Sequence, residues 1–214
     1  MAYSEKDGDA YRRIYVDGEN SAHVLGYTGV GKSGVEATQN FTLQKLDNEI
    51  MQRLKAFING DEPEGNSIVL TVDSYLQKIG SDLMRTNNGA VVVIEVKTGR
   101  VVCMVSKPNY DPQSVAENWD SLREDENSPL LNRAAQGLYP PGSTFKIVTA
   151  VSAMRNLGDV NSFEYTCTGV AEFDGKIIHC YNDKAHGNVN LTSAFAQSCN
   201  CYFAELGKKM GAVN

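Results

Sequence analysis

The sequence contains no long hydrophobic run. None of its apolar segments approaches the roughly 20 residues that a helix needs to cross a bilayer. The polar N-terminal stretch "MAYSEKDGDAYRR" does not have the pattern of a signal peptide. Basic residues are also few: 20 Lys and Arg stand against 26 Asp and Glu, which leaves a net charge of −6. Because a nucleic-acid-binding surface needs clustered positive charge, the composition excludes that class of function.

Cysteine is the next scarce residue type. The sequence has five, and an odd number argues against a simple, fully paired disulfide framework. The rest of the composition, 42% hydrophobic and 21% charged, is that of an ordinary globular protein. The 214 residues contain no internal repeat and are enough for one large domain or two smaller ones.

Two regions are predicted, divided near residue 66. Apolar residues at helical spacing from Leu43 to Phe57 predict a helix that ends at an Asn-Gly pair. The next stretch, "DEPEGNS" at residues 61–67, has no apolar side chain, and we interpret it as a linker. We therefore expect a first region over residues 1–66 and a second over residues 67–214.

The second region begins with regular elements. "SIVLTVD" at residues 67–73 predicts a short strand, and residues 74–86 predict an amphipathic helix. Two β-rich runs then flank the Lys-Thr-Gly of residues 97–99, which predicts a hairpin with this tripeptide as its turn. Farther along, residues 143–158 keep a helical period, and Gly158 suits the C-cap.

Residues 26–33, "GYTGVGKS", match the G-x-x-x-x-G-K-[ST] pattern of phosphate-binding P-loops. Such a loop needs a buried strand before it and a helix that starts at its Lys-Ser pair. Only four residues, "AHVL", separate the motif from a turn, and Gly34 directly after Ser33 weakens a helix start. We interpret the stretch as a glycine-rich loop, with a nucleotide-binding module as the alternative.

Residues 140–146, "PPGSTFK", contain a serine and a lysine with different chemistry. The Pro-Pro-Gly cannot continue a helix from upstream, so we expect Ser143 at or near a helix N-terminus, with Lys146 on the same face. A serine is a weak nucleophile until a base takes its proton, and a desolvated lysine can be that base. The helix N-terminus would also stabilise a developing oxyanion. An inert pair on an exposed helix face is the alternative.

A second motif, Ser198-Cys199-Asn200, follows about fifty residues later. A hydroxyl there can relay a proton, and a side-chain amide can hold a substrate carbonyl. The succession of S-x-x-K and S-x-N belongs to the motif set of β-lactamases and penicillin-binding proteins. On these motifs the chain resembles a class B penicillin-binding protein, a D,D-transpeptidase of peptidoglycan synthesis.

The resemblance covers nearly the whole chain, in order and in spacing. One segment, "AHVLGYTGVGKSGVEATQNFTLQ", is similar to the non-catalytic N-terminal region of the family. Four others resemble its transpeptidase domain: "IVLTVDSYLQ", "GAVVVIEVKTGRVVCMVSKPNYDP", "NRAAQGLYPPGSTFKIVTA" and "HGNVNLTSAFAQSCNCYFAELG". The resemblance implies an α/β (α+β) transpeptidase fold of the penicillin-binding-protein/β-lactamase type. The fold would be incomplete here. It would consist of an antiparallel sheet with helices, preceded along the chain by a small non-catalytic pedestal or dimerisation region.

The resemblance also implies roles for four residues. Ser143 would be the acylated nucleophile, Lys146 its general base and Ser198 a proton relay, while Asn200 would hold the peptide. The enzyme would cross-link stem peptides at the extracytoplasmic face of a bacterial membrane, with an N-terminal anchor outside this chain. β-Lactams would acylate it, a glycosyltransferase would be among its cell-wall partners, and catalysis would require no cofactor.

The third motif of the family, Lys-Thr/Ser-Gly, follows Ser-x-Asn by a long stretch. Here Lys97-Thr98-Gly99 and Lys32-Ser33-Gly34 both precede Ser143, so we assign neither to catalysis. The chain also ends inside "GKKMGAVN", in mid-element. We therefore expect this chain to be part of a longer protein. In the family the third motif lies on a strand whose backbone N–H completes the oxyanion hole, and losing one such donor typically costs about 10²–10³ in rate. We expect this chain to have little or no activity alone.

Cys167, Cys180, His186 and Cys199 have the spacing C-x₁₂-C-x₅-H-x₁₂-C. Three thiolates and an imidazole suit a tetrahedral zinc ion, and the metal that some relatives of the family hold near this region supports a structural zinc site. A Cys167–Cys180 disulfide and buried free thiols are the alternatives. Cys103 is interpreted as a strand core residue and Cys201 as a helix-face residue, while the sequence indicates no role for His23 or His179.

Other enzymes and binding proteins of the Ser-x-x-Lys superfamily are alternatives to the transpeptidase. A β-lactamase or β-lactam sensor is compatible with "PGSTFK", although the N-terminal sixty-odd residues and the whole-chain match argue against it. A catalytically silent scaffold for cell-wall partners is a further alternative, against which the intact Ser, Lys and Ser-x-Asn residues argue.

Overall fold

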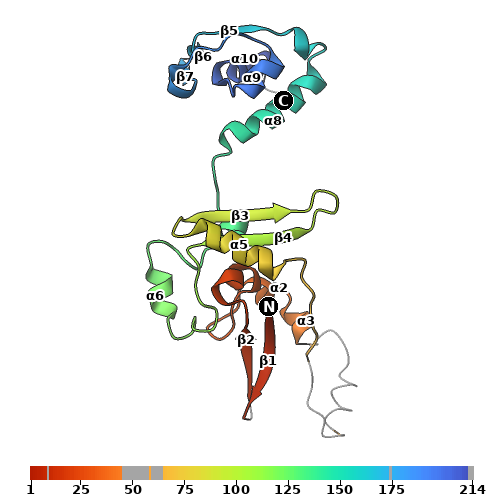
Figure 1. Ribbon diagram of the computed structural model, residues 1–214, viewed down its shortest axis with the longest axis vertical. Coiled ribbons are helices and arrows are strands. Elements are labelled where there is room, and N and C mark those ends of the chain that lie inside the picture. Colours follow the sequence, from red (N-terminus) through yellow and green to blue (C-terminus); the bar gives the residue numbers. More distant parts are fainter. Residues whose placement is uncertain (9, 45–57, 59–64, 174, 212–214) are drawn as a thin grey trace. The chain divides into compact units, whose positions relative to one another are not determined.

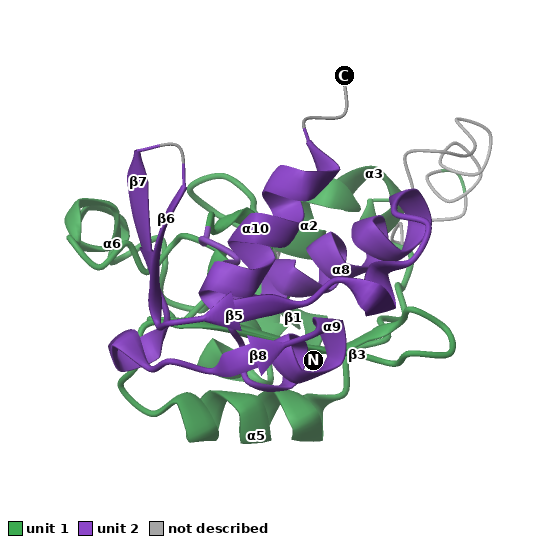
Figure 2. Ribbon diagram, turned by 90° about the horizontal axis from the view of Figure 1, so that it is seen from above, with its two compact units in different colours: residues 1–138 green, residues 139–214 purple. Residues whose placement is uncertain are grey.

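The computed structural model describes the chain apart from residues 9, 45–57, 59–64, 174 and 212–214. It has two compact units, Met1–Leu138 and Tyr139–Asn214 (Figure 2). All four sheets that the described residues form are two-stranded and antiparallel. Among these residues, no helix has the length and apolarity that a membrane crossing requires.

Unit 1 begins with an antiparallel hairpin and continues through short helices to a second hairpin (Figure 1). Its described elements are β1 (Ala2–Asp7), β2 (Ala10–Tyr15), η1 (Gly18–Ser21), α1 (Ala22–Leu25), α2 (Gly34–Thr38), α3 (Asn40–Leu43), α5 (Ser74–Met84), β3 (Gly89–Ile94), β4 (Val101–Lys107), α6 (Trp119–Glu124) and α7 (Arg133–Gln136). The helix predicted from Leu43 to Phe57 overlaps α3 only at its start. The rest of that helix and most of the predicted linker lie outside the described residues.

The glycine-rich stretch of residues 26–33 is a closed loop between α1 and α2. Gly26 has a φ of +86°, and a Cβ there would lie 1.8 Å from the carbonyl oxygen of Ser33. Only glycine permits this backbone contact. A helix, α1, precedes the loop where a P-loop needs a strand, and α2 is only five residues long. The interpretation of this stretch as a loop is therefore confirmed.

Helix α5 and the β3–β4 hairpin are the two elements that the sequence predicts here, and in the structure α5 packs against β4 of the hairpin. Asp73 caps α5: its carboxylate accepts hydrogen bonds from the backbone N–H of Tyr75 at 2.8 Å and of Leu76 at 3.0 Å. The buried side chain of Gln77 ties the helix to β4, because its Nε2 donates to the carbonyl of Met104 at 3.0 Å. In the hairpin turn, Gly99 has the positive φ, +74°, that the turn requires.

The prediction of a strand over residues 67–73 is wrong. The described residues show no strand there, and Val69 is 95% exposed. Near the end of the segment, the backbone N–H of Asp73 donates to the carbonyl of Val102 at 2.9 Å. A strand needs a ladder of such backbone bonds with a neighbouring strand, and Thr71 instead contacts the carbonyl of Val101 through its side-chain hydroxyl.

Unit 2 packs three helices with two small sheets. Its described elements are η2 (Gly142–Thr144), α8 (Phe145–Asn156), η3 (Val160–Ser162), β5 (Tyr165–Cys167), β6 (Val170–Phe173), β7 (Lys176–His179), η4 (Tyr181–Asp183), β8 (Gly187–Val189), α9 (Leu191–Ala196) and α10 (Asn200–Met210). Strand β5 pairs with β8, and β6 with β7. Tyr202 and Leu206 of α10 are fully buried in a core that includes Ala153 of α8 and Ala194 of α9.

The ends of the unit 2 helices differ in part from the prediction. Helix α8 ends at Asn156 because Leu157 takes an extended backbone, with φ −102° and ψ 128°, so the predicted C-cap role of Gly158 is wrong. Helix α9 begins with a capping box, in which Asn190 and Ser193 satisfy each other's backbone N–H groups. The predicted helical pattern around Ser198-Cys199-Asn200 is broken between α9 and α10.

Candidate active site

Ser143 lies where the chain enters α8. It is the middle residue of the single 3-10 turn η2, which leads directly into the helix. Gly142 opens this turn with a φ of +54°. The structure therefore places Ser143 at the N-terminal end of a helix, as the Pro-Pro-Gly predicts, and Lys146 follows in the first turn of α8. Positive potential at this end favours negative charge that develops near Ser143.

The ammonium group of Lys146 is the centre of the site. Its Nζ lies 3.3 Å from Oγ of Ser143 and 2.9 Å from Oγ of Ser198. It also donates to the carbonyl oxygen of Ser198 at 2.7 Å and to Oδ1 of Asn200 at 2.5 Å. The hydroxyl of Ser198 in turn donates to Oγ of Ser143 at 3.0 Å. The structure thus brings together all four residues for which the sequence predicts catalytic or binding roles.

Partial burial lowers the pKa of Lys146. Nearby Cys199 and Cys180 act in the opposite direction, because negative charge on their sulfurs would favour the ammonium. The ring of Phe203 covers part of the lysine, with its centroid 5.6 Å from Nζ. A lysine with a lowered pKa gives up its proton more readily, which is what a general base for Ser143 requires.

Ser198 has a left-handed backbone conformation, with a φ of +52°. Residues other than glycine adopt it rarely, and strained backbone of this kind clusters at functional sites. Ser198 comes just before α10, where Sγ of Cys199 accepts a hydrogen bond from the backbone N–H of Tyr202 at 3.4 Å. The conformation presents both the hydroxyl and the carbonyl oxygen of Ser198 to Lys146.

Asn200 is held at both ends of its amide. Its Oδ1 accepts from Lys146, and its Nδ2 donates to the main-chain carbonyl of His179 at 2.7 Å. The sequence indicates no role for His179. The contact uses its main-chain carbonyl, which every residue type carries, so no sequence pattern could have predicted it. An amide nitrogen carries two N–H groups, so one is available for a substrate carbonyl.

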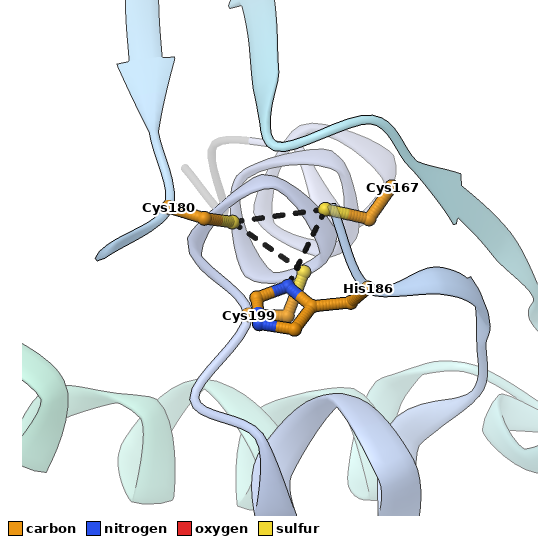
Figure 3. Close-up of side chains that lie close together, drawn as sticks. All are labelled: Cys167, Cys180, His186 and Cys199. Atoms are coloured by element: carbon orange, nitrogen blue, oxygen red, sulfur yellow. Dashed lines mark hydrogen bonds between the residues drawn. The ribbon is translucent and has the colours of Figure 1, made fainter. Parts of the chain in front are cut away.

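Four potential metal ligands converge beside this site. The donor atoms of Cys167, Cys180, His186 and Cys199 all lie within 4.8 Å of one another (Figure 3). The Sγ of Cys180 lies 3.7 Å from that of Cys167 and 3.9 Å from that of Cys199, and Nδ1 of His186 lies 3.5 Å from Sγ of Cys167. A tetrahedral zinc ion separates two sulfur ligands by about 3.8 Å and a sulfur from a nitrogen by about 3.6 Å. The residues therefore fit a zinc ion.

The disulfide alternative is not formed in this structure. All five cysteines are free thiols, and a disulfide would need a sulfur–sulfur distance of about 2.05 Å. Burial raises the pKa of Cys167, but hydrogen bonds from His186 and from the backbone N–H of Gly169 outweigh it, and the pKa is lowered to about 6. Cys201, interpreted as a helix-face residue, is fully buried, with its Sγ 3.6 Å from that of Cys180. Cys103 is buried in β4, as predicted.

Residues 89–213 match the family model described as the penicillin binding protein transpeptidase domain. This chain belongs to the penicillin-binding protein transpeptidase family. Residues 1–68 match a second model, described as the penicillin binding protein A dimerisation domain. The predicted α+β fold is confirmed, since the solved structures that resemble the chain are penicillin-binding proteins.

Three relatives illustrate the likeness. The peptidoglycan D,D-transpeptidase PbpA of Mycolicibacterium smegmatis is 32% identical in an alignment that covers 99% of this chain and 48% of the relative. The imipenem acyl-enzyme complex of penicillin-binding protein A from M. tuberculosis has a TM-score of 0.90 at 30% identity, covering 99% of this chain and 54% of the other. PBP2 from Helicobacter pylori, in its complex with MreC, has a TM-score of 0.77 at 26% identity, covering 94% and 43%. The chain thus spans about half the length of the first of these penicillin-binding proteins.

Proposed function

We propose that the full-length protein is a serine D,D-transpeptidase that cross-links peptidoglycan stem peptides. The observation that carries the proposal is the convergence of Ser143, Ser198 and Asn200 on Nζ of Lys146. This arrangement supplies a nucleophile, a base with a lowered pKa and a proton relay within hydrogen-bond reach, which is the geometry that acyl transfer needs. The name of the M. smegmatis relative, a peptidoglycan D,D-transpeptidase, supports the same reaction.

The residues of the site take separate parts in this reaction. Neutral Lys146 accepts the Ser143 proton as Oγ attacks the carbonyl carbon between the two terminal D-alanines of a donor stem peptide. The peptide bond breaks, the departing D-alanine takes up the proton through Ser198, and an ester on Ser143 is left. An amine of a neighbouring stem peptide then attacks that ester and gives up a proton to the Ser143 oxygen through Lys146, so the cross-linking amide bond forms and the Ser143 hydroxyl is restored. Asn200 orients the donor through its second amide N–H.

β-Lactams would form the same ester on Ser143. The M. tuberculosis relative is described as an imipenem acyl-enzyme, so a protein of this fold takes up a β-lactam covalently. The experiment that tests the proposal is labelling of the full-length protein with a fluorescent penicillin. We expect a stable adduct that disappears in Ser143→Ala. An adduct that survives in Ser143→Ala would refute the assignment, and rapid release of hydrolysed β-lactam would favour a β-lactamase instead.

We also propose a zinc ion bound by Cys167, Cys180, His186 and Cys199. The support is the agreement between their separations and those of a tetrahedral zinc site. When bound, the ion would act as a structural cross-link. Cys199 contributes to this cluster, whereas its neighbours Ser198 and Asn200 contact Lys146. The ligands would therefore hold the start of α10 in place.

The family also supports a proposal for the setting of the enzyme. We propose that residues 1–66 belong to the non-catalytic region and residues 67–214 to the transpeptidase domain, which the two matched models support. We place the protein at the extracytoplasmic face of a bacterial membrane, where its peptidoglycan substrate lies. Its partners would be cell-wall synthesis proteins such as a glycosyltransferase, and the H. pylori relative in complex with MreC supports an assembly of that kind.

A further inference from the structure

The orientation of the Asn200 amide depends on the main chain at His179. A carbonyl oxygen can only accept a hydrogen bond, so the His179 carbonyl can face only the Nδ2 end of the amide. This contact leaves Oδ1 toward Lys146. It also sets the direction of the second N–H of Nδ2. The position of the His179 carbonyl therefore decides how Asn200 meets both the lysine and a substrate.

The His179 carbonyl lies at the end of β7, where a tight turn begins. Across this turn, Nδ1–H of His179 donates to Oδ1 of Asp183 at 2.7 Å. Asn182 and Asp183 are both left-handed, with φ of +52° and +54°. Two successive residues of this kind persist only where surrounding contacts impose the conformation.

The opposite side of the turn is packed against Gly169. A Cβ on Gly169 would lie 2.0 Å from the carbonyl oxygen of Asp183, so only glycine fits there. The backbone N–H of Cys180 also donates to the carbonyl of Gly169 at 2.8 Å. On this side the main chain is fixed by backbone contacts. On the solvent side, the side-chain hydrogen bond between His179 and Asp183 spans the turn.

We propose that His179 and Asp183 are positioning residues for acylation: their hydrogen bond fixes the end of β7, whose carbonyl orients the Asn200 amide. The inference rests on the proposed acyl-transfer function of Ser143. Neither side chain belongs to the core, since the two are 56% and 61% exposed. Exposed pairs contribute little to stability, so their substitution should leave the fold intact and act on the site.

The experiment measures acylation of the full-length protein by a fluorescent penicillin, with the binding step resolved from the acylation step. His179→Ala and Asp183→Ala each remove the His179–Asp183 hydrogen bond and should both slow acylation about three- to tenfold, the worth of one hydrogen bond, and leave the binding constant unchanged. His179→Ala reports the hydrogen bond alone, because His179 is a strand residue whose backbone is not left-handed. Asp183→Asn should restore most of the rate, because asparagine keeps an acceptor oxygen and tolerates the left-handed backbone. Asp82→Ala, which removes the exposed Lys78–Asp82 pair of α5, is the matched control and should acylate at the wild-type rate.

A double-mutant cycle separates positioning from a general loss of structure. In an Asn200→Ala background, Asp183→Ala should slow acylation no further, because the amide that it acts through is gone. Effects that multiply would overturn the inference, as would a wild-type rate for Asp183→Ala or no recovery in Asp183→Asn. The Ser143→Ala variant tests the proposed function independently. If labelling depends on Ser143 but not on Asp183, only this inference fails.

Discussion

Removal of one of the four proposed zinc ligands is the perturbation whose size the structure best defines. Structural zinc sites bind with apparent free energies of about 10–16 kcal/mol, which four ligands share at about 2.5–4 kcal/mol each. Cys180 lies within 3.7 to 3.9 Å of both other thiol ligands, so serine in its place should cost a full share. We expect Cys180→Ser to bind zinc about 10²–10³-fold more weakly than the wild-type protein.

The assay is metal analysis of purified full-length protein, followed by competition with a chelator. Two cysteines provide matched controls: Cys103 in β4 is buried but is not among the clustered donors, and Cys201 contacts Cys180 without belonging to the donor set. Both Cys103→Ser and Cys201→Ser should keep one zinc per chain. A chelator should lower the Tm of the wild-type protein and lower that of Cys180→Ser by less, because more weakly bound zinc contributes less stability.

Two results would refute this reasoning. The first is wild-type protein without zinc, with a disulfide measured between two of the clustered cysteines. The second is wild-type zinc affinity in Cys180→Ser, which would show that the thiol is not a ligand. A lower affinity in Cys201→Ser, equal to that in Cys180→Ser, would mean that the donor set itself has to be redrawn.

Three further predictions test other parts of the account. Because burial lowers the pKa of Lys146, the acylation rate of the full-length protein should rise with pH and level off, with the midpoint of the rise below 10.5, the ordinary pKa of lysine. This rise should vanish in Lys146→Ala. A midpoint at or above 10.5 would contradict the lowered pKa. Leu206→Ala, at a fully buried position, should reduce the free energy of unfolding by about 2–5 kcal/mol in a denaturant titration, and a loss below 1 kcal/mol would place Leu206 outside the core. Calorimetric titration with Mg-ATP should show no heat of binding, since residues 26–33 form a closed loop after a helix, whereas saturable binding that Lys32→Ala removes would revive the P-loop interpretation.

Some elements could be predicted because their causes are local. The turn at Lys97-Thr98-Gly99 depends on glycine at a positive φ, and the start of the helix near Ser143 depends on the preceding Pro-Pro-Gly. Both depend on residues within a few positions of each other. The failure at residues 67–73 has the opposite cause, because an apolar run becomes a strand only if its backbone forms a hydrogen-bond ladder with a distant segment, which residue type alone does not decide.

The sequence by itself determined the family, the two-motif pattern of Ser-x-x-Lys and Ser-x-Asn, and the candidate zinc ligands, because these rest on residue type and spacing. Only the tertiary structure decided that Lys146 meets Ser198 and Asn200, which are more than fifty positions away. It also decided that Cys199 joins the thiol cluster while its neighbours face the lysine. The contact of Asn200 with the His179 carbonyl lay wholly beyond prediction, because every residue carries the same carbonyl and only the folded path of the chain selects which one is used.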